Sequence, residues 1–139
     1  MSDFVLDASV ALAWVLDNPI APYAIEVRRA FASGKRGLIP ALWHLEVANG
    51  LATAMRRRDL VGTDLDDALG TIQATVAQAI DTEMNFIPVG EALANARSFQ
   101  LTAYDAVYLE LAQREGLPLA TLDKRLRAAA AKAGIHAMS

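Results

Sequence analysis

The chain has 139 residues, of which 54% are hydrophobic, and a mean hydropathy of +0.24. This length suits one compact domain over residues 1–139 with a real core, and the composition excludes general disorder. It contains no cysteine, which excludes disulfides, thiolate metal sites and cysteine nucleophiles, and suits a cytoplasmic protein. No apolar run approaches the roughly 20 residues that cross a bilayer, and the N-terminus lacks signal-peptide character, so we expect no membrane association.

The first half of the chain alternates short apolar runs with helical patterns. A strand is predicted at residues 4–6, followed by helices at 9–16 and 20–32. A second strand is predicted at 37–39, and a long helix at 41–58 that begins beside Pro40.

The second half continues the alternation. Its predicted elements are a helix at 63–81, a strand at 85–87, helices at 91–98 and 103–114, a strand at 117–120, a helix at 123–133 and a possible fifth strand at 135–137. Strands that alternate with helices, and that are almost continuously apolar, predict an α/β fold in which a parallel sheet of about five strands is covered by helices on both faces.

Four acidic residues interrupt apolar segments of this pattern: Asp7, Glu46, Asp105 and Asp123. Asp7 and Asp123 follow predicted strands, and ligands of open α/β sheets bind beyond the carboxyl ends of the strands. A buried carboxylate is unfavourable by several kcal/mol unless its charge is compensated, and several converging carboxylates repel one another unless a cation lies between them. The pattern therefore predicts an oxygen-ligand metal site, with Mg²⁺ or Mn²⁺ as the ion.

Helix capping is the alternative explanation for three of these acids. Asp7 could cap the following helix, although Ser9 could take that role and release Asp7. Thr102 and Asp105 fit a capping box, and Asp123 could be a first-turn acid favoured by the helix dipole.

Glu46 has no capping explanation, because it lies in the middle of a predicted helix. It is expected at the margin of an apolar stripe, with Asn49 one turn further on the same face. The stripe is expected to consist of Leu45, Ala48, Ala52 and Met55. A surface glutamate is the alternative, but the pair suits a shared polar cleft.

The charge balance is acidic overall, with a formal net charge of −3. Without the four acids, 12 acidic residues face 13 basic ones, so the acidity is concentrated in the predicted site. A net-acidic chain lacks the footprint of a general nucleic-acid binder, so any contact with RNA must be local. The best placed basic residues are Lys124, Arg125 and Arg127 beside Asp123, where a solvated helix face is the alternative.

Four segments together resemble the PIN domain family, specifically the VapC-type toxins of bacterial toxin–antitoxin pairs. They are VLDAS at 5–9, PALWHLEVAN at 40–49, LTAYDAVYLELA at 101–112 and LATLDKRL at 119–126, and the resemblance covers essentially the whole chain. Each motif is short, but the four in this order are fairly specific. The resemblance implies a PIN-like three-layer sandwich with a parallel five-stranded sheet between helices.

The same resemblance implies an activity and a set of partners. Asp7, Glu46 and Asp105 would be the acidic metal-binding core, and Asp123 the fourth acid. Among the supporting residues, Ser9 would support Asp7, Asn49 would orient the site, and Thr102 would order the loop before Asp105. The implied protein is an Mg²⁺- or Mn²⁺-dependent endoribonuclease, a homodimeric toxin held by a cognate antitoxin.

Two other readings remain open. An aspartate-nucleophile phosphatase also places an Asp after its first strand, but its pattern has a second Asp two residues later, where this chain has Ser9. The second alternative is a PIN nuclease that is not a toxin, or a non-catalytic PIN-like module that binds RNA or protein. The expected position of Glu46 and Asn49 on a polar cleft argues against the non-catalytic module, because a purely structural domain would not need these polar residues there.

Overall fold

A parallel four-stranded sheet forms the centre of the molecule in the computed structural model, which describes residues 1–139. The strand order is β3-β2-β1-β4. The strands are β1 (Phe4–Leu6), β2 (Gly37–Pro40), β3 (Ile80–Glu83) and β4 (Leu119–Ala120). The register pairs Val5 with Leu38 on one side and with Leu119 on the other. The predicted α/β class and parallel sheet are confirmed.

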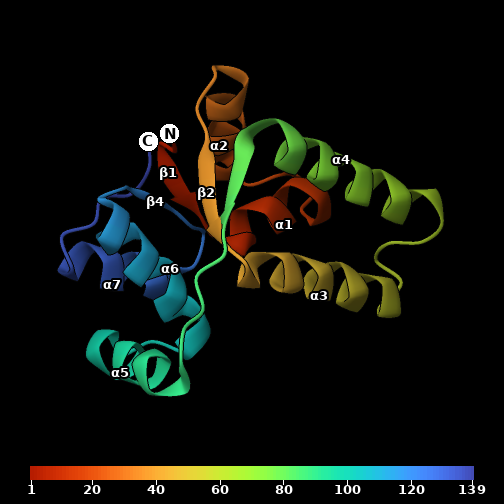
Figure 1. The fold of residues 1–139 in the computed structure, drawn as a ribbon. Helices are drawn as coiled ribbons and strands as arrows, with labels where there is room; N and C mark the ends of the chain where they lie inside the picture. The colour runs from red at the N-terminus through yellow and green to blue at the C-terminus, as the bar shows by residue number, and fades with distance from the viewer.

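Helices cover both faces of this sheet (Figure 1). One face carries α1, which packs against α2, α3 and α4, and the other carries α6, which packs against α5 and α7. The helices are α1 (Ala8–Leu16), α2 (Pro22–Ala32), α3 (Leu42–Arg56), α4 (Thr63–Ala79), α5 (Val89–Phe99), α6 (Ala103–Glu115) and α7 (Lys124–Lys132). None of them has the length and apolar content needed to cross a bilayer.

The core fills the space between the two helical layers and the sheet. All three residues of β1 are fully buried, since helices cover both of its faces. The largest buried side chains from the helices are Trp43 on α3 and Tyr108, Leu109 and Leu111 on α6. These two helices therefore have fixed orientations on the sheet, and each carries one of the four acids of interest.

The third strand lies at residues 80–83, so its predicted position at 85–87 is wrong. Strand β3 follows α4 without an intervening loop, which removes the turn signal that separates elements in the sequence. It is an edge strand, and two of its residues are acids that form ion pairs: Asp81 with Arg36, and Glu83 with Arg114. Because these partners stabilise it, β3 needs no apolar run. Phe86, on which the wrong assignment depended, is 86% exposed.

Two smaller differences concern strand ends. Pro40 was expected beside a helix start but is the last residue of β2, paired with Glu83. At that point β2 has only β3 as a neighbour, because its pairing with β1 covers Gly37 and Leu38, so the missing N–H of proline breaks no second ladder. The possible fifth strand is reduced to a single parallel bridge between Leu119 and Ala137.

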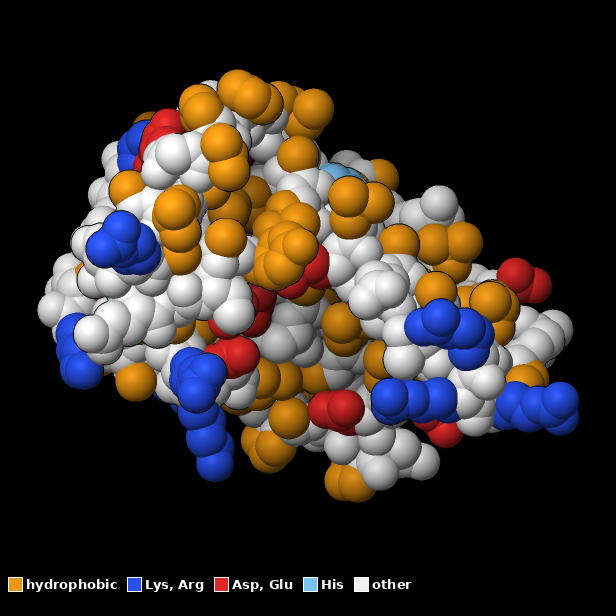
Figure 2. Space-filling model, turned by 90° about the horizontal axis from the view of Figure 1, so that it is seen from below, with side chains coloured by type: hydrophobic (Ala, Val, Ile, Leu, Met, Phe, Trp, Pro, Cys, Tyr) orange, Lys and Arg blue, Asp and Glu red, His pale blue; other side chains and the backbone are white.

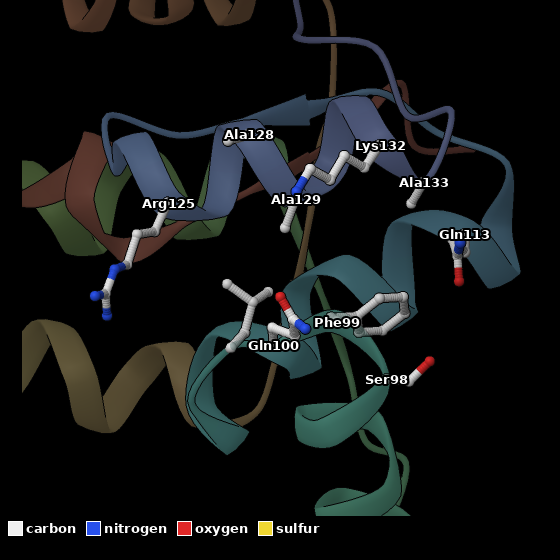
Figure 3. Close-up of a pocket in the computed structure, with 10 residues that line it drawn as sticks. Ser98, Phe99, Gln100, Gln113, Arg125, Ala128, Ala129, Lys132 and Ala133 are labelled. Atoms are coloured by element: carbon white, nitrogen blue, oxygen red, sulfur yellow. The ribbon is translucent and has the colours of Figure 1, made fainter.

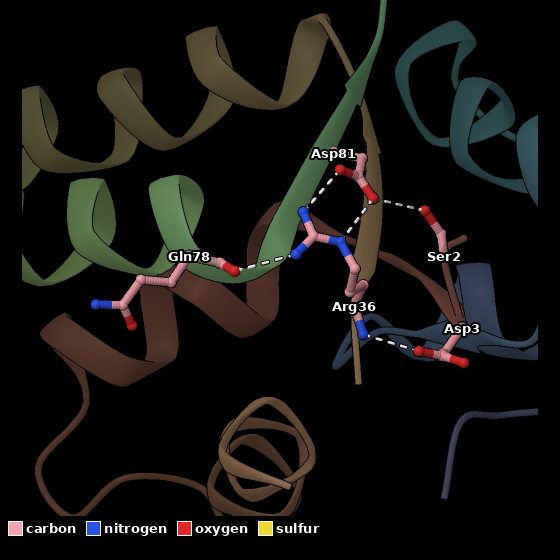
Figure 4. Close-up of polar contacts among 5 residues, drawn as sticks. All are labelled: Ser2, Asp3, Arg36, Gln78 and Asp81. Carbon is pink, nitrogen blue, oxygen red and sulfur yellow. Dashed lines mark hydrogen bonds and ion pairs between the residues drawn. The ribbon is translucent and has the colours of Figure 1, made fainter. Parts of the chain in front are cut away.

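A polar cluster at the amino end of the sheet fastens the edge strand to the N-terminus (Figure 4). The Arg36 guanidinium donates to both carboxylate oxygens of Asp81, at 3.1 and 2.8 Å, and to the carbonyl of Gln78 at 3.1 Å. The Ser2 hydroxyl donates to the same carboxylate at 3.1 Å. Asp3 accepts a bond from the Arg36 backbone N–H at 2.9 Å. The side-chain hydrogen bond from Arg36 lowers the pKa of Asp81 below its usual value.

This cluster predicts a pH-dependent contribution of Asp81 to stability. Because the folded-state pKa of Asp81 is lowered, its contribution is present above the ordinary carboxyl pKa of 3.8 and is lost as pH falls through the folded value. We expect Asp81→Asn to lower the free energy of unfolding at pH 7 by less than about 1 kcal/mol, since the pair is partly exposed. Urea unfolding of both proteins at neutral and acid pH measures the difference.

Asp67→Asn is the matched control, because Asp67 is an exposed acid on α4. A difference for Asp81→Asn that stays constant down to acid pH, or that the control reproduces, would contradict the assignment.

Candidate acidic site at the carboxyl end of the sheet

The carboxyl ends of the strands open onto one end of the molecule, where acidic side chains gather in a central hollow (Figure 2). Asp7 is the deepest of them and is only 5% exposed. It directly follows β1 and holds the N-cap position of α1, yet its side chain makes no capping bond. The carboxylate is thus available for a role other than capping.

Two hydroxyl groups hold the Asp7 carboxylate in place. Ser9 Oγ donates to Asp7 Oδ2 at 2.6 Å, and Thr121 Oγ1 donates to the same oxygen at 2.7 Å. Both hydroxyls also accept backbone bonds, Ser9 from Leu122 N and Thr121 from Asp123 N, each at 3.0 Å. The predicted contact of Ser9 with Asp7 is present, whereas the alternative in which Ser9 caps α1 is not realised, because Asp7 holds the N-cap position. Burial raises the pKa of Asp7, and the two hydroxyl donors oppose that rise.

Glu46 reaches the site from the second turn of α3 and is half-buried. Its Oε1 accepts a hydrogen bond of 2.5 Å from the hydroxyl of Tyr108, a fully buried residue of α6. Burial raises the pKa of Glu46, and the negative charges of Asp7 and Asp105 raise it further, while the Tyr108 bond lowers it. This bond links α3 to α6 across the site and fixes one of the two Glu46 oxygens.

The apolar stripe expected beside Glu46 is not the buried face of α3. The helix buries Trp43, Val47, Leu51 and Ala54. Leu45 is 73% exposed and Met55 47%, and Ala48 and Ala52 are exposed too. Because α3 is rich in apolar residues all round, its sequence alone does not show which face is buried. Glu46 still points toward α6, where its carboxylate accepts the Tyr108 hydrogen bond, and the charges of Asp7 and Asp105 raise its pKa.

Asp105 and Asp123 both lie at helix starts, and the structure separates their roles. Thr102 is the N-cap of α6, and its hydroxyl accepts the Asp105 backbone N–H at 3.1 Å, as predicted. The Asp105 side chain makes no reciprocal capping bond, so its carboxylate is not used for capping. Asp123 is itself the N-cap of α7, and its Oδ1 accepts from Leu126 N at 2.9 Å. Asp123 therefore precedes the helix as its cap and does not lie in the first turn, the alternative given for it, and its charge still acts on Asp7 and Asp105.

No lysine or arginine forms an ion pair with any of the four acids. The pKa of Asp105 is raised by burial first, and then by the charges of Asp123 and Asp7. Hard oxygen donors and uncompensated negative charge are the chemistry that suits Mg²⁺ or Mn²⁺. By donor type and charge, the residues fit a divalent cation. By geometry they do not form a ready site, because no three acidic or histidine side chains are placed so that they could hold one ion.

The remaining predicted residues differ in how they relate to the cluster. Asn49 is exposed on α3 and forms no hydrogen bond with the acids. Arg127 donates to the carbonyl of Thr121 at 2.7 Å, and its guanidinium lies 4.6 Å from the centre of the Tyr23 ring, so these contacts occupy it. Lys124 is exposed. Arg125 is close enough to Asp105 for its charge to lower the pKa of that carboxyl.

Two contributors to the site were not predicted. Thr121, which follows the strand predicted at 117–120, and Tyr108 were given no role in the predicted site, yet their hydroxyls donate hydrogen bonds to Asp7 and Glu46. A signal for Thr121 existed, since it is a hydroxyl residue directly after an apolar strand. Tyr108 carried no such signal: its hydroxyl finds an acid 62 positions away, which only the packing of α6 against α3 determines.

The hydroxyl pair around Asp7 yields a prediction. Thr121→Val keeps the shape of the side chain but removes a hydrogen bond that lowers the pKa of Asp7. We expect the Asp7 pKa to rise further and the free energy of unfolding at pH 7 to fall by about 1–3 kcal/mol. Carbon-13 NMR titration of the Asp7 carboxyl measures the first effect, and urea unfolding the second.

Thr121→Ser is the control, because it restores the hydroxyl. An Asp7 pKa that is the same in the Val and Ser variants would show that the Thr121 bond does not act on the carboxylate.

Comparisons with known proteins relate this fold to a family. Residues 4–132 match the PIN domain. A crystal structure titled PAE2754, from Pyrobaculum aerophilum, is similar in fold, with a TM-score of 0.70 and 23% sequence identity over 92% of this chain and 84% of that one. A search of curated proteins gives no match. With the parallel sheet and an acidic group at its carboxyl end, the family match shows that the chain belongs to the PIN domain family.

Proposed function

We propose that this PIN protein is a metal-dependent endoribonuclease that acts as the toxin of a toxin–antitoxin pair. The PIN fold is generally a nuclease fold, which supports the hydrolytic part. The observation that carries the proposal is the acidic group at the carboxyl end of the sheet, where Asp7, Glu46 and Asp105 have raised pKa values and form no ion pair with a basic side chain. Such a group of buried carboxylates is electrostatically unfavourable by itself, and a bound cation would compensate its negative charge.

The residues divide the work of phosphodiester hydrolysis. Asp7, Glu46 and Asp105 would hold the ion, with Asp123 adding charge from the N-cap of α7. A bound Mg²⁺ or Mn²⁺ supplies positive charge that polarises the phosphoryl group and lowers the pKa of water. Ser9 and Thr121 fix the Asp7 carboxylate by donating to one of its oxygens, which leaves the other for the ion. Tyr108 does the same for Glu46. No nucleophilic side chain is needed.

Nuclease activity gives the direct test of the enzymatic part. The purified protein is expected to cleave single-stranded RNA with Mn²⁺ or Mg²⁺, and EDTA should abolish cleavage. Asp7→Asn and Glu46→Gln are expected to reduce the rate by about 100-fold or more, because each removes a charge that holds the ion. Gel assays of labelled RNA measure this.

Glu91→Gln is the matched control, since Glu91 is an exposed acid of α5. Cleavage that persists in EDTA, or that survives both site substitutions, would disprove the proposal.

The toxin role is tested in a bacterial host. Induced expression of the parent is expected to arrest growth, and expression of Asp7→Asn is expected to have no effect at equal protein levels. Growth arrest by both proteins would separate toxicity from the acidic site. Normal growth with the active parent would leave a PIN nuclease that is not a toxin.

Partner surfaces follow from the same proposal. A cognate antitoxin would cover the acidic hollow and insert Arg or Lys between carboxylates that form no ion pair within this chain.

A homodimer would use α3 and α4, where Leu45, Met55 and Leu69 are 73%, 47% and 43% exposed. A largely apolar groove of about 350 Å³ lies between these two helices. Exposed apolar side chains beside such a groove suit a second copy of the chain.

Light scattering tests the dimer. The parent is expected to have the mass of a dimer at micromolar concentration, and Leu69→Glu is expected to have the mass of a monomer with an unchanged circular dichroism spectrum. The control is Leu93→Glu, an exposed leucine on α5, away from the groove. A monomeric parent would reject the dimer.

A non-catalytic PIN module is the second candidate, and one observation favours it. No three acidic side chains are close enough, as they lie, to surround an ion. RNA binding without cleavage under any divalent cation would support this candidate. The aspartate-nucleophile phosphatase is less well supported, because the residue two positions after Asp7 is Ser9, whose hydroxyl bonds Asp7 instead of acting as a second acid.

A further inference from the structure

A second cavity lies beside the acidic hollow, between the end of α5, helix α6 and helix α7 (Figure 3). We infer that this cavity is a subsite that binds the nucleotide next to the scissile phosphodiester of a single-stranded RNA. The inference deepens the proposed function and rests on it. The volume of the cavity is about 640 Å³, within the range of pockets that bind small organic ligands.

The charges of the lining point to an anionic ligand. Arg125 and Lys132 line the cavity, and no acidic residue does. The two cations are seven residues apart on α7, or about two turns and 10 Å along the helix, so both lie on its cavity side. In a chain with a net charge of −3, this is a local concentration of positive charge. Such a pair of cations suits consecutive phosphates of one strand.

The cavity adjoins the acidic site along α7. The helix begins at its N-cap, Asp123, and Arg125, which lines the cavity, lies two residues further on. The cations of the cavity wall follow from there toward Lys132. A strand whose phosphate lies over the acids would therefore pass Arg125 first and Lys132 second.

The rest of the lining offers contacts for a base. Figure 3 shows Phe99 and Gln100 on the wall opposite α7, the helix that carries Lys132 and, at one end of the cavity, Arg125. Phe99 is a half-buried aromatic ring, and bases of single-stranded RNA stack on such rings without strong sequence preference. Gln100 and Gln113 are both exposed and carry amides that can donate to and accept from base edges. Cations, one aromatic ring and neutral amides together fit a nucleotide better than an acidic peptide, which would leave the ring and the amides without a role.

The test compares RNA lengths in the full protein. Lys132→Gln is expected to weaken binding of a labelled hexanucleotide in EDTA by about fourfold at 0.15 M salt, the effect of a salt slope of about 0.7 per phosphate contact of a single strand. The slope itself should fall by about 0.7. Phe99→Leu, which keeps an apolar side chain, is expected to weaken the same binding by about fivefold or more, because stacking on the ring is lost. A dinucleotide carries only the scissile phosphate and has no further phosphate for Lys132 to contact, so Lys132→Gln should weaken its binding much less than that of the hexanucleotide.

Arg28→Gln is the control: it also removes one charge, from an exposed position of α2 on the other side of the sheet. Hexanucleotide binding that is equal in the parent, Lys132→Gln and Phe99→Leu overturns the subsite, whether or not the protein cleaves RNA. Competition by an oligoglutamate peptide as strong as by the hexanucleotide overturns the assignment to RNA. Length-dependent binding that needs Lys132, with no RNA cleaved by the parent, supports the subsite and rejects the nuclease.

Discussion

The burial of carboxylates that form no ion pair, at the carboxyl end of the sheet, is the constraint around which this molecule is organised. Asp7 is 5% exposed, and Glu46 and Asp105 are half-buried. The charges of Asp7 and Asp105 raise the pKa of Glu46, and the charge of Asp7 raises the pKa of Asp105. A fold held together only by packing would place a cation beside these groups or replace them with apolar residues. Here Arg36 and Arg114 form ion pairs with other acids instead: Asp81 and Glu83 of β3, and Glu110 of α6. The site keeps its negative charge.

The surroundings of the acids hold their geometry without neutralising them. Hydroxyl groups of Ser9, Thr121 and Tyr108 stabilise the carboxylates by donating hydrogen bonds and add no charge. Burial raises the pKa of Tyr108, so its hydroxyl remains a donor. The arrangement keeps the carboxylates in position while leaving the positive charge to come from outside the chain. That is the arrangement expected for a site that binds a cation and then an anionic substrate.

Much of the fold follows from the sequence because the central strands have no polar residues. The apolar runs that became β1, β2 and β4 need burial on both faces, and their alternation with helices leaves few alternatives to a parallel sheet. The edge strand β3 could not be found in this way, because Arg36 and Arg114 stabilise it from distant parts of the chain. The buried face of α3 was also misjudged, since an Ala-rich helix carries apolar residues on several sides.

The site was predictable where a residue's position in its own element sets its role. Asp7 after β1 and Thr102 before Asp105 are examples. The site was not predictable where contacts between distant parts of the chain set a residue's role. Examples are the hydrogen bond from Tyr108 to Glu46, the cation–π contact of Arg127 with Tyr23, and the place of Lys132 in the cavity lining. The family match adds the fold and its general activity, whereas ion, substrate and partner must be argued from side chains.

Thermal unfolding of the parent and Asp7→Asn, with EDTA and with excess Mn²⁺, tests the central claim most directly. A carboxyl whose folded-state pKa is raised favours folding below its ordinary value of 3.8 and opposes it as pH rises through the folded value. In EDTA at pH 7, Asp7→Asn should therefore unfold at a higher temperature than the parent, and the difference should vanish at acid pH. Mn²⁺ at about 100 times its dissociation constant should stabilise the parent by about 2.7 kcal/mol and the variant far less. Equal stability of the two proteins in EDTA, with no response of the parent to Mn²⁺, would contradict the account.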